Sequence, residues 1–556
     1  MVLNQYILLC TLLLIVSCSD QSSKVVKRGQ KSHPKQAIIE PPQSVLTISK
    51  HWQHLDHSID GIVGVSTYKA SEKLALLQPN EVIVAVLDSG IDIHHPDLSS
   101  QIWINEGEIP ANGIDDDGNG YIDDRHGWNF LGSDDGKNIV EENLEETRIY
   151  RNFIRRLQRG EHLNSGEQKL FETVKNIVEH GIVENRMALR EATLDAKALG
   201  NYMKVLKDKT GISEITTREQ LEAFDSKELE TLKDALLELW DKYWLGFSGI
   251  RRAIENANYH LRYGYNLDLN VRSEIIGDQT DDFTDQSYGN NDVVGENSEH
   301  GTHVAGIIGA TRGNGIGVDG IASKVKIMVL RVIPKGDERD KDIANAIRYA
   351  ADNGAQIINL SFGKRFSPYK AEVDQALQYA YEKGVLFVHA AGNEGLNIDG
   401  GKDNFPNSYR SDFVRKTDFN SAWLEVAANT GEIGYKFVPY FSNYGKEAAH
   451  FFAPGDKIYS TTPQGGYATF SGTSMAAPVV TGVAAILMSE YPNLKASEVK
   501  AILMSSAFRP DDFIVQKPSL KHLEPGFRLP IGFKHLSKTG GIVNAFKALE
   551  LTKNLF

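Results

Sequence analysis

Short apolar runs alternate with amphipathic segments along much of the chain. One run, VIVAVL at 82–87, has β-branched residues at most positions. Further runs of this kind lie at 324–333, 355–360 and 385–389. Between the later runs, 342–354 and 373–384 place apolar residues at helical spacing. Apolar strands joined by helices are typical of a parallel sheet buried on both faces. The pattern predicts a three-layer α/β fold with a mostly parallel sheet.

A stretch of different character, residues 137–285, interrupts this pattern. Proline is absent from 111 to 333, and the stretch mixes charges of both signs. Its apolar residues at helical spacing include Leu170, Phe171, Val174, Ile177 and Val178, and later Leu229, Leu232, Leu236 and Trp240. Thr217 and Gln220 form a capping-box pattern. We predict an α-helical insertion at 137–285, which divides one domain into a first part, 51–136, and a second part, 286–556.

Composition and charge narrow the classes of partner. The chain is 41% hydrophobic and 24% charged, as in ordinary globular proteins. Its net charge of −13 argues against nucleic acid as a partner, because phosphate binding needs a basic face. The two cysteines, Cys10 and Cys18, both precede the predicted domain, which therefore forms no internal disulfide.

The N-terminus has the pattern of an export signal. The apolar run 6–16 is short for a membrane span and suits the core of a signal peptide. The following IVSC resembles a bacterial lipobox, although no Lys or Arg precedes the run. We expect residues 1–18 to be the signal, Cys18 to be lipidated and polar residues 19–50 to form a flexible tether. This predicts a lipid-anchored protein of the bacterial envelope, in the outer membrane; a secreted protein and an uncleaved anchor are the alternatives.

Four polar residues stand where predicted strands end or helices begin. Asp88 ends the run at 82–87, Asn393 follows that at 385–389, and His300 and Ser474 precede small-residue helical patterns. Active sites of open α/β sheets lie at the carboxyl ends of strands. Each residue alone also fits a structural role, such as a turn cap or tight helix packing. The histidines of HGTH are spaced by three, but no third metal ligand recurs at helical spacing.

Taken together, six sequence blocks resemble those of subtilisin-like serine proteases, in the same order. The blocks are VLDSGID (86–92), HGTHVAG (300–306), INLSFG (358–363), AAGNEG (390–395), FAPG (452–455) and GTSMAAP (472–478). The resemblance extends from about 52 to 551, apart from the insertion. It implies the subtilisin-like fold and a serine endopeptidase that cleaves extended polypeptides through an acyl-enzyme.

The resemblance also implies a role for each residue of the site. Ser474 would be the nucleophile, His300 the general base and acid, and Asp88 the carboxylate that orients the imidazole. Asn393 and the backbone N–H of Ser474 would bind the oxyanion. His303 is expected to belong to the scaffold. The positions that match the family's substrate contacts are Ser361, Phe362, Gly363, Ala391 and Gly392.

An acidic loop between 112 and 130 carries five aspartates within ten residues. Positions 1, 3, 5, 6 and 9 of an EF-hand-type loop are matched by Asp115, Asp117, Asn119, Gly120 and Asp123. Position 12, normally Glu, is His126, and no EF-hand helix pair surrounds the loop. We interpret it as a structural Ca²⁺ site with Asp115, Asp117, Asn119 and Asp123 as ligands; a solvated acidic turn is the alternative.

Other functions remain open at this point. A non-catalytic binding lipoprotein would share the fold, but all three triad residues are present. A metal-dependent hydrolase lacks its ligand spacing. The insertion is either a packed appendage or a lid that selects substrates, since it lies between two triad residues. Residues 19–80 are short and polar for a folded inhibitory propeptide, which leaves the mode of activation open.

Overall fold

The computed structural model describes residues 49–74, 80–224, 226–243, 246–286, 288–401, 404–409, 419–520 and 529–555. The predicted signal segment, Cys18 and residues 19–48 of the predicted tether lie outside these ranges. Among the described residues, α12 (Thr473–Glu490) is the helix long and apolar enough to cross a membrane, and it is almost entirely buried within the fold.

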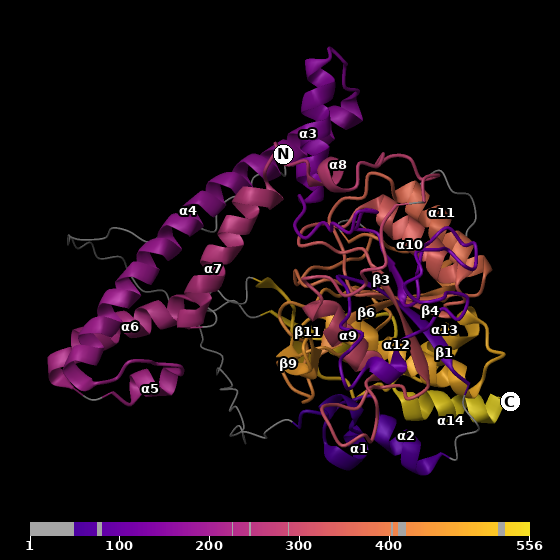
Figure 1. The fold of residues 1–556 in the computed structure, drawn as a ribbon. Coiled ribbons are helices and arrows are strands. Elements are labelled where there is room, and N and C mark those ends of the chain that lie inside the picture. The colour runs from indigo at the N-terminus through magenta and orange to yellow at the C-terminus, as the bar shows by residue number, and fades with distance from the viewer. Residues whose placement is uncertain are drawn as a thin grey trace, which may run out of the picture. The chain divides into compact units, whose positions relative to one another are not determined.

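A seven-stranded sheet forms the centre of the described chain (Figure 1), and all of its strands pair in parallel. In spatial order the strands are β2 (Gly127–Asn129), β3 (Val325–Arg331), β1 (Val82–Asp88), β4 (Ile357–Leu360), β5 (Leu386–Ala390), β6 (Trp423–Asn429) and β7 (Phe451–Pro454). Two antiparallel pairs lie outside it: β8 (Ile458–Thr462) with β9 (Gly466–Phe470), and β10 (Ile514–Gln516) with β11 (Pro530–Gly532). The predicted α/β fold with a mostly parallel sheet is confirmed.

Helices cover the sheet because its strands are apolar on both sides. The strands β4, β5, β6 and β7 are buried at every position. Helix α9 (Glu299–Gly309) and α12 pack on each other and on the sheet, and α10 (Asp340–Asp352) packs on α11 (Lys370–Glu382) and on β1 and β3. The shorter helices are α1 (His57–Asp60), α2 (Thr67–Lys73), α13 (Ala496–Ser505) and α14 (Ala545–Leu555). Parallel pairing brings the carboxyl ends of the strands to one edge, where the candidate residues stand.

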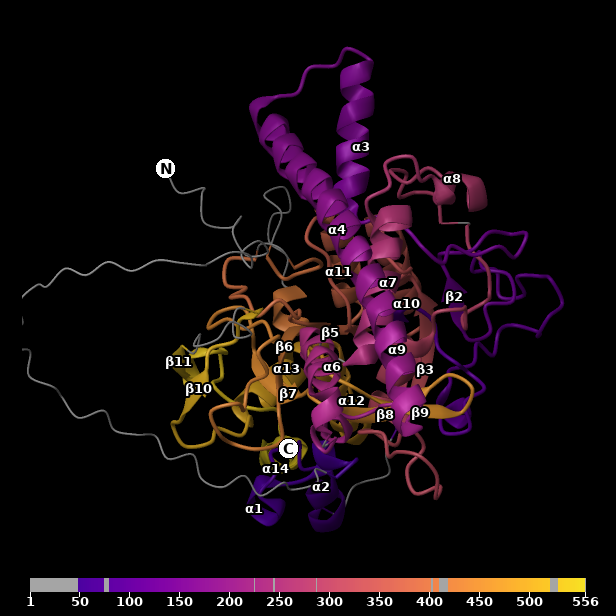
Figure 2. The ribbon, with the colours of Figure 1, turned by 90° about the vertical axis from the view of Figure 1, so that its left-hand side faces the viewer.

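The segment between β2 and α9 is helical, as the sequence predicts. Its helices are α3 (Glu145–Gln158), α4 (Ser165–Thr210), α5 (Arg218–Glu222), α6 (Glu230–Lys242), α7 (Phe247–Tyr259) and α8 (Val271–Ile275). Figures 1 and 2 show α4 and α7 side by side over much of their length. The predicted capping box of Thr217 and Gln220 is present, and Val174 and Val178 of the predicted apolar face are fully buried. The long helix α4 begins at a second capping box, Asn164 with Glu167.

Candidate active site

Asp88 and His300 form the first pair of the site. Asp88 ends β1 and is 2% exposed, whereas His300 is the second residue of α9. The Nδ1 of His300 lies 2.8 Å from Oδ1 and 3.0 Å from Oδ2 of Asp88. Because a carboxylate only accepts, Nδ1 carries the proton, and the neutral ring then presents Nε2 as an acceptor.

Glycines allow α9 to come this close to the end of β1. A Cβ atom on Gly301 would overlap the carbonyl oxygen of Gly90 and lie 3.2 Å from the Cβ of Asp88. Gly90 has a φ of 114°, and a Cβ there would overlap the carbonyl oxygen of Val294. The glycines of DSG and HGTH therefore meet a steric requirement of the Asp88–His300 pair.

The surroundings of His300 raise the pKa of its imidazole. Burial lowers the pKa of the imidazole, but the charge and hydrogen bond of Asp88, together with Glu299, outweigh it and raise the pKa above 6.5. The side chain nevertheless remains 39% exposed. The ring is thus held on its Nδ1 side and open on the other, as a group that exchanges protons requires.

Ser474 is the second residue of α12, and Pro478 frees its carbonyl group. Pro478 lies four residues on and has no N–H, so the usual helical hydrogen bond to the carbonyl of Ser474 is missing. The hydroxyl of Ser361 takes that place, donating to the carbonyl oxygen of Ser474 at 3.0 Å. In return the Ser474 hydroxyl donates to the carbonyl oxygen of Ser361 at 3.0 Å.

Asn393 is tied to the start of α12. Its Oδ1 accepts from the backbone N–H of Thr473 at 2.9 Å and from the Thr473 hydroxyl at 3.2 Å. This fixes the amide so that Nδ2 remains as a donor. An ideal Cβ on Gly472 would lie 3.6 Å from that Nδ2 and 3.7 Å from the backbone N of Ser474, so both donors border the same small space. Two N–H donors beside a helix start suit a developing oxyanion.

The five predicted substrate contacts lie on two neighbouring strand ends. Residues 361–363, here named the substrate edge, follow β4, and Ala391 and Gly392 follow β5. Ser361 is buried, Phe362 half-buried and Gly363 exposed. Asn404 stands between them: a Cβ on Gly363 would overlap its amide oxygen, and its Nδ2 donates to the carbonyl of Ala391 at 3.0 Å.

A buried pair behind the substrate edge, His389 with Glu425, was missed by the sequence analysis. Leu360 pairs with His389 at the end of β4, and beyond it the regular pairing stops. There His389 Nε2 donates to the carbonyl oxygen of Phe362 at 2.9 Å, in place of the next backbone hydrogen bond. The Nδ1 of His389 lies 2.9 Å from Oε1 of Glu425.

The carboxylate of Glu425 accepts two further hydrogen bonds. Its Oε2 accepts from the indole N–H of Trp423 at 2.8 Å, and its Oε1 accepts from Asn404 at 3.3 Å. Both oxygens therefore act as acceptors, and both nitrogens of His389 face acceptors. His389, held by Glu425, thus fixes the Phe362 carbonyl inward. The sequence motif points to Phe362, but no local pattern indicates that His389 pairs with Glu425, which is 36 residues away.

His303 has the scaffold role that the sequence predicts. Its Nε2 lies 3.1 Å from the carbonyl oxygen of Ala468, and its ring stacks on Phe470 with centroids 4.3 Å apart. Burial lowers the pKa of His303 to about 4. It is therefore neutral and helps to join α9 to β9.

The acidic loop brings together part of the predicted ligand set. Asp115 and Asp117 lie with Glu108, and one carboxylate oxygen of each falls within 4.8 Å of the others. Asp123 accepts instead from the backbone N–H groups of Asn112 and Gly113, and Asn119 from that of Tyr121. Glu108 was missed, because it stands seven residues before the loop's first aspartate. Burial and the nearby Asp124 and Asp117 raise the pKa of Glu108, although backbone N–H groups oppose them.

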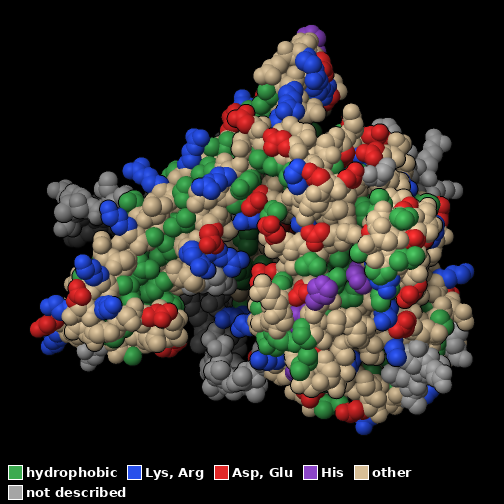
Figure 3. Space-filling model, in the orientation of Figure 1, with side chains coloured by type: hydrophobic (Ala, Val, Ile, Leu, Met, Phe, Trp, Pro, Cys, Tyr) green, Lys and Arg blue, Asp and Glu red, His purple; other side chains and the backbone are tan. Residues whose placement is uncertain are grey.

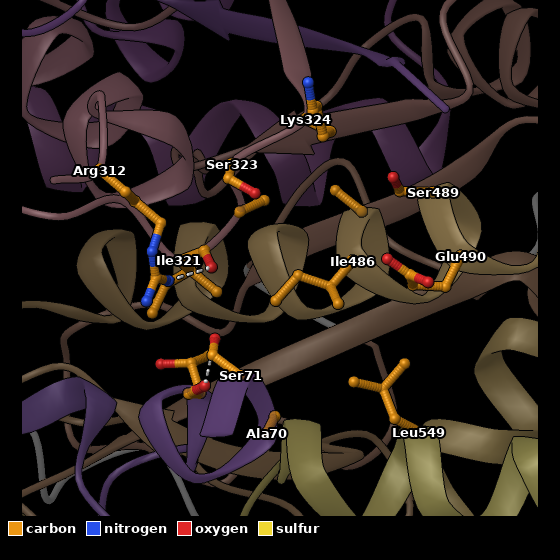
Figure 4. Close-up of a pocket in the computed structure, with 13 residues that line it drawn as sticks. Ala70, Ser71, Arg312, Ile321, Ser323, Lys324, Ile486, Ser489, Glu490 and Leu549 are labelled. Atoms are coloured by element: carbon orange, nitrogen blue, oxygen red, sulfur yellow. Dashed lines mark hydrogen bonds between the residues drawn. The ribbon is translucent and has the colours of Figure 1, made fainter. Parts of the chain in front are cut away.

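A separate cavity of about 100 Å³ lies between α2, α12 and α14 (Figure 4). Its Arg312 donates to the carbonyl oxygens of Gly320 and Ile321, and Ser71 donates to that of Thr67. Ser489 and Glu490 line it from the far end of α12, about 24 Å along the helix from Ser474. The cavity has no part in the site described above.

Comparisons with known proteins agree with this geometry. The model of the subtilase family matches residues 79–534. Thermophilic serine proteinase from Bacillus sp. strain AK1 is 38% identical over 214 residues, which are 38% of this chain and 47% of the relative. Thermitase from Thermoactinomyces vulgaris is 38% identical over 220 residues, 39% of this chain and 70% of the relative. The chain thus spans about half the length of the first relative.

A solved structure of a cold adapted subtilisin-like serine proteinase is also similar. It is 30% identical in sequence, with a TM-score of 0.33, and the match covers 43% of this chain and 76% of that one.

The contact between Asp88 and His300 predicts how the imidazole of His300 titrates. In wild type the imidazole should titrate above pH 6.5, because Asp88 raises its pKa. In Asp88→Asn the charge is lost, burial dominates, and the pKa should fall below that value. Histidine-selective NMR over pH 4–9 measures both, with the signal assigned from His300→Gln. An unchanged midpoint in Asp88→Asn would contradict the electrostatic role of Asp88.

Proposed function

The chain belongs to the subtilase family, and we propose that it is a serine endopeptidase with Asp88, His300 and Ser474 as its triad. The observation that carries the proposal is the pairing of His300 with Asp88 at 2.8 and 3.0 Å, at the sheet edge where Ser474 and Asn393 join the start of α12. Its substrate would be an extended polypeptide laid along the substrate edge, since strand addition tolerates varied sequence.

The proposed reaction has two stages. As Ser474 Oγ attacks the carbonyl carbon of the peptide bond, Nε2 of His300 takes the hydroxyl proton. The charge that develops on the carbonyl oxygen is met by Asn393 Nδ2 and the backbone N–H of Ser474. His300 then gives the proton to the leaving amine. In the second stage water repeats the attack on the acyl-enzyme, and Ser474 regains its proton. Asp88 stabilises the imidazolium in both stages.

Two substitutions, Ser474→Ala and Asn393→Ala, test the proposed activity. Ser474→Ala should lose both covalent labelling by a fluorophosphonate and cleavage of a denatured protein, because the attacking oxygen is gone. Asn393→Ala should keep its nucleophile but lose about 10²–10³-fold in kcat, the range for loss of an oxyanion donor in a subtilisin. Circular dichroism provides the control for folding. A folded wild type that neither labels nor cleaves would favour the binding-lipoprotein alternative or latency caused by the insertion.

We further propose that the acidic loop holds a structural Ca²⁺ ion with Glu108, Asp115 and Asp117 among its ligands. Carboxylate oxygens are the donors that Ca²⁺ prefers, and three of them within 4.8 Å repel one another without a cation. The backbone N–H groups around Asp115 hold the loop in a shape that presents these oxygens. The ion would brace the loop and takes no part in the proposed chemistry.

Chelation should therefore lower the melting temperature of the wild type. Binding at 100 times the Kd contributes about 2.7 kcal/mol, which corresponds to a shift of a few °C in a chain of this size. Glu108→Gln with Asp117→Asn should melt at the same temperature with and without Ca²⁺. The matched control is Asp134→Asn, an exposed acid outside the cluster, which should keep the Ca²⁺ response. An equal response in both variants would exclude this ligand set.

We also propose that Cys18 carries a lipid that anchors the protein at the bacterial envelope, in the outer membrane. The support is the sequence alone: the apolar run, the IVSC pattern and the polar stretch that follows. Wild type expressed in a Gram-negative host should enter the detergent phase and the outer-membrane fraction, and Cys18→Ala should not. A Cys10→Ala control should behave as wild type. Soluble wild type in the medium would support secretion instead. We propose no nucleic-acid partner.

A further inference from the structure

A solvent-open cleft of about 650 Å³ lies where the helical insertion meets the segment that follows the substrate edge. Helix α3, the start of α4 and residues 270–280 form one side, and residues 366–369 form the other. Phe153, Phe366 and Tyr369 are among its apolar lining. Phe366 also packs into the apolar core that α3 shares with α4. The cleft therefore exists only because the insertion docks against the protease body.

Lys364 joins this cleft to the substrate edge. It follows Gly363 directly, and its fully buried ammonium lies 2.8 Å from Glu145 of α3 and 2.8 Å from Asp340. Asp340 also accepts from the hydroxyl of Ser367 at 3.0 Å and from the backbone N–H of Tyr369 at 2.8 Å. The substrate edge and the wall of the cleft thus belong to one continuous segment, which Asp340 and Glu145 hold in place.

The charged lining of the cleft is mostly arginine. Six arginines line it: Arg148, Arg151, Arg155, Arg156, Arg272 and Arg339. Four of them are paired with acids. The pairs are Arg148 with Glu145, Arg156 with Glu161 and Glu167, Arg272 with Asp278 and Asp342, and Arg339 with Glu142. Arg151 and Arg155 are the two lining arginines that no acid pairs among the described residues.

Arg151 and Arg155 are one helical turn apart on α3, where Figure 3 shows Lys and Arg side chains gathered. Arg151 bonds only to neutral oxygens, Oδ1 of Asn143 and the carbonyl of Leu269. Arg155 is exposed, and its side chain has no acidic partner within the described part of the chain. Burial lowers the pKa of Arg151 to about 10; Glu142 opposes this, but Arg155, Arg339 and Arg148 add to it. These two guanidinium groups are therefore the ones in the lining that an incoming acid could pair.

Building on the endopeptidase activity proposed above, we propose that this cleft binds an acidic segment of the polypeptide substrate that precedes the cleaved bond. Ser361 contacts Ser474, so the substrate edge begins at the reacting serine and leads away from it toward residues 366–369. The edge borders the residue before the cut, so earlier residues lie further along it. Residues 366–369 follow Ser361 by five to eight positions, so we take the bound segment to lie about five to eight residues before the cut.

The chemistry of the cleft favours this occupant over the chain's own N-terminal stretch. Residues 19–50 carry six Lys or Arg against two acids, so they would be repelled by the unpaired arginines. The apolar side chains between the arginines suit a segment in which Asp or Glu alternates with larger apolar residues.

Direct binding to the Ser474→Ala chain tests the proposal without any turnover. Two fluorescent peptides share all residues except positions five to eight before the cut, which are Glu in one and Gln in the other. The Glu peptide should bind about fivefold more tightly by anisotropy, the upper range for an exposed ion pair. Adding Arg155→Glu should remove or reverse this preference. Adding Arg190→Glu, an exposed arginine on α4 outside the cleft, should leave it intact.

The outcomes test the cleft proposal separately from the endopeptidase proposal. Equal affinity for the two peptides, no binding of either, or a preference unaffected by Arg155→Glu would overturn the cleft assignment, whatever the wild type cleaves. A preference that depends on Arg155 would support it even if the wild type cleaved nothing, in which case the endopeptidase proposal alone would fail. With an active wild type, the Glu peptide should show a lower KM and an unchanged kcat, because the cleft acts on binding and not on the reacting atoms.

Discussion

The buried ammonium of Lys364 is the constraint on which the arrangement of the insertion depends. A fully buried charge is tolerated only when its partners are in place, and removing one partner of such a pair typically costs about 3–5 kcal/mol. Lys364 lies in the protease body, yet one of its carboxylates, Glu145, belongs to the insertion. Burial raises the pKa of Glu145, but Arg148 and Lys364 outweigh it and lower the pKa to about 2, so this carboxylate stays charged. The body is therefore built to have the insertion docked, as both a packed appendage and a substrate-binding element require.

Successive carbonyl groups of the substrate edge accept hydrogen bonds from opposite sides. The carbonyl of Phe362 is fixed inward by His389, while the Ser361 carbonyl meets the hydroxyl of Ser474. Successive carbonyl groups of an extended strand point to opposite sides. Fixing the inner one therefore also sets the direction of the outer ones, which a substrate strand would use. The substrate edge and the start of α12 are thus held by neighbours within the fold, and one of these, Ser361, also contacts the Ser474 hydroxyl.

What the sequence allowed us to predict follows from local patterns. The β-branched runs and the helical spacings predicted the parallel sheet. Asp88 could be assigned to the edge of the sheet because it ends such a run, and Asn393 because it follows one. The capping box at Thr217 and the scaffold role of His303 could also be predicted from the sequence. The pairs formed by tertiary approach were not: Glu145 is 219 residues from Lys364, and Glu425 is 36 from His389. Nothing in the local pattern around Glu108 points to Asp115 and Asp117 either, since the turn that joins them is irregular.

The histidines of the fold indicate why one of them suits proton transfer. His303 is neutral, because burial lowers its pKa to about 4, and burial with nearby lysines lowers the pKa of His450 still more clearly. His389 has both ring nitrogens in hydrogen bonds within the core, to Glu425 and to the carbonyl of Phe362. His300 alone among these combines a carboxylate at Nδ1 with a partly exposed ring whose Nε2 has no hydrogen bond within the described residues. A ring with both nitrogens satisfied cannot change its charge without breaking a contact, whereas His300 can gain and lose a proton at Nε2 while Asp88 holds it in place.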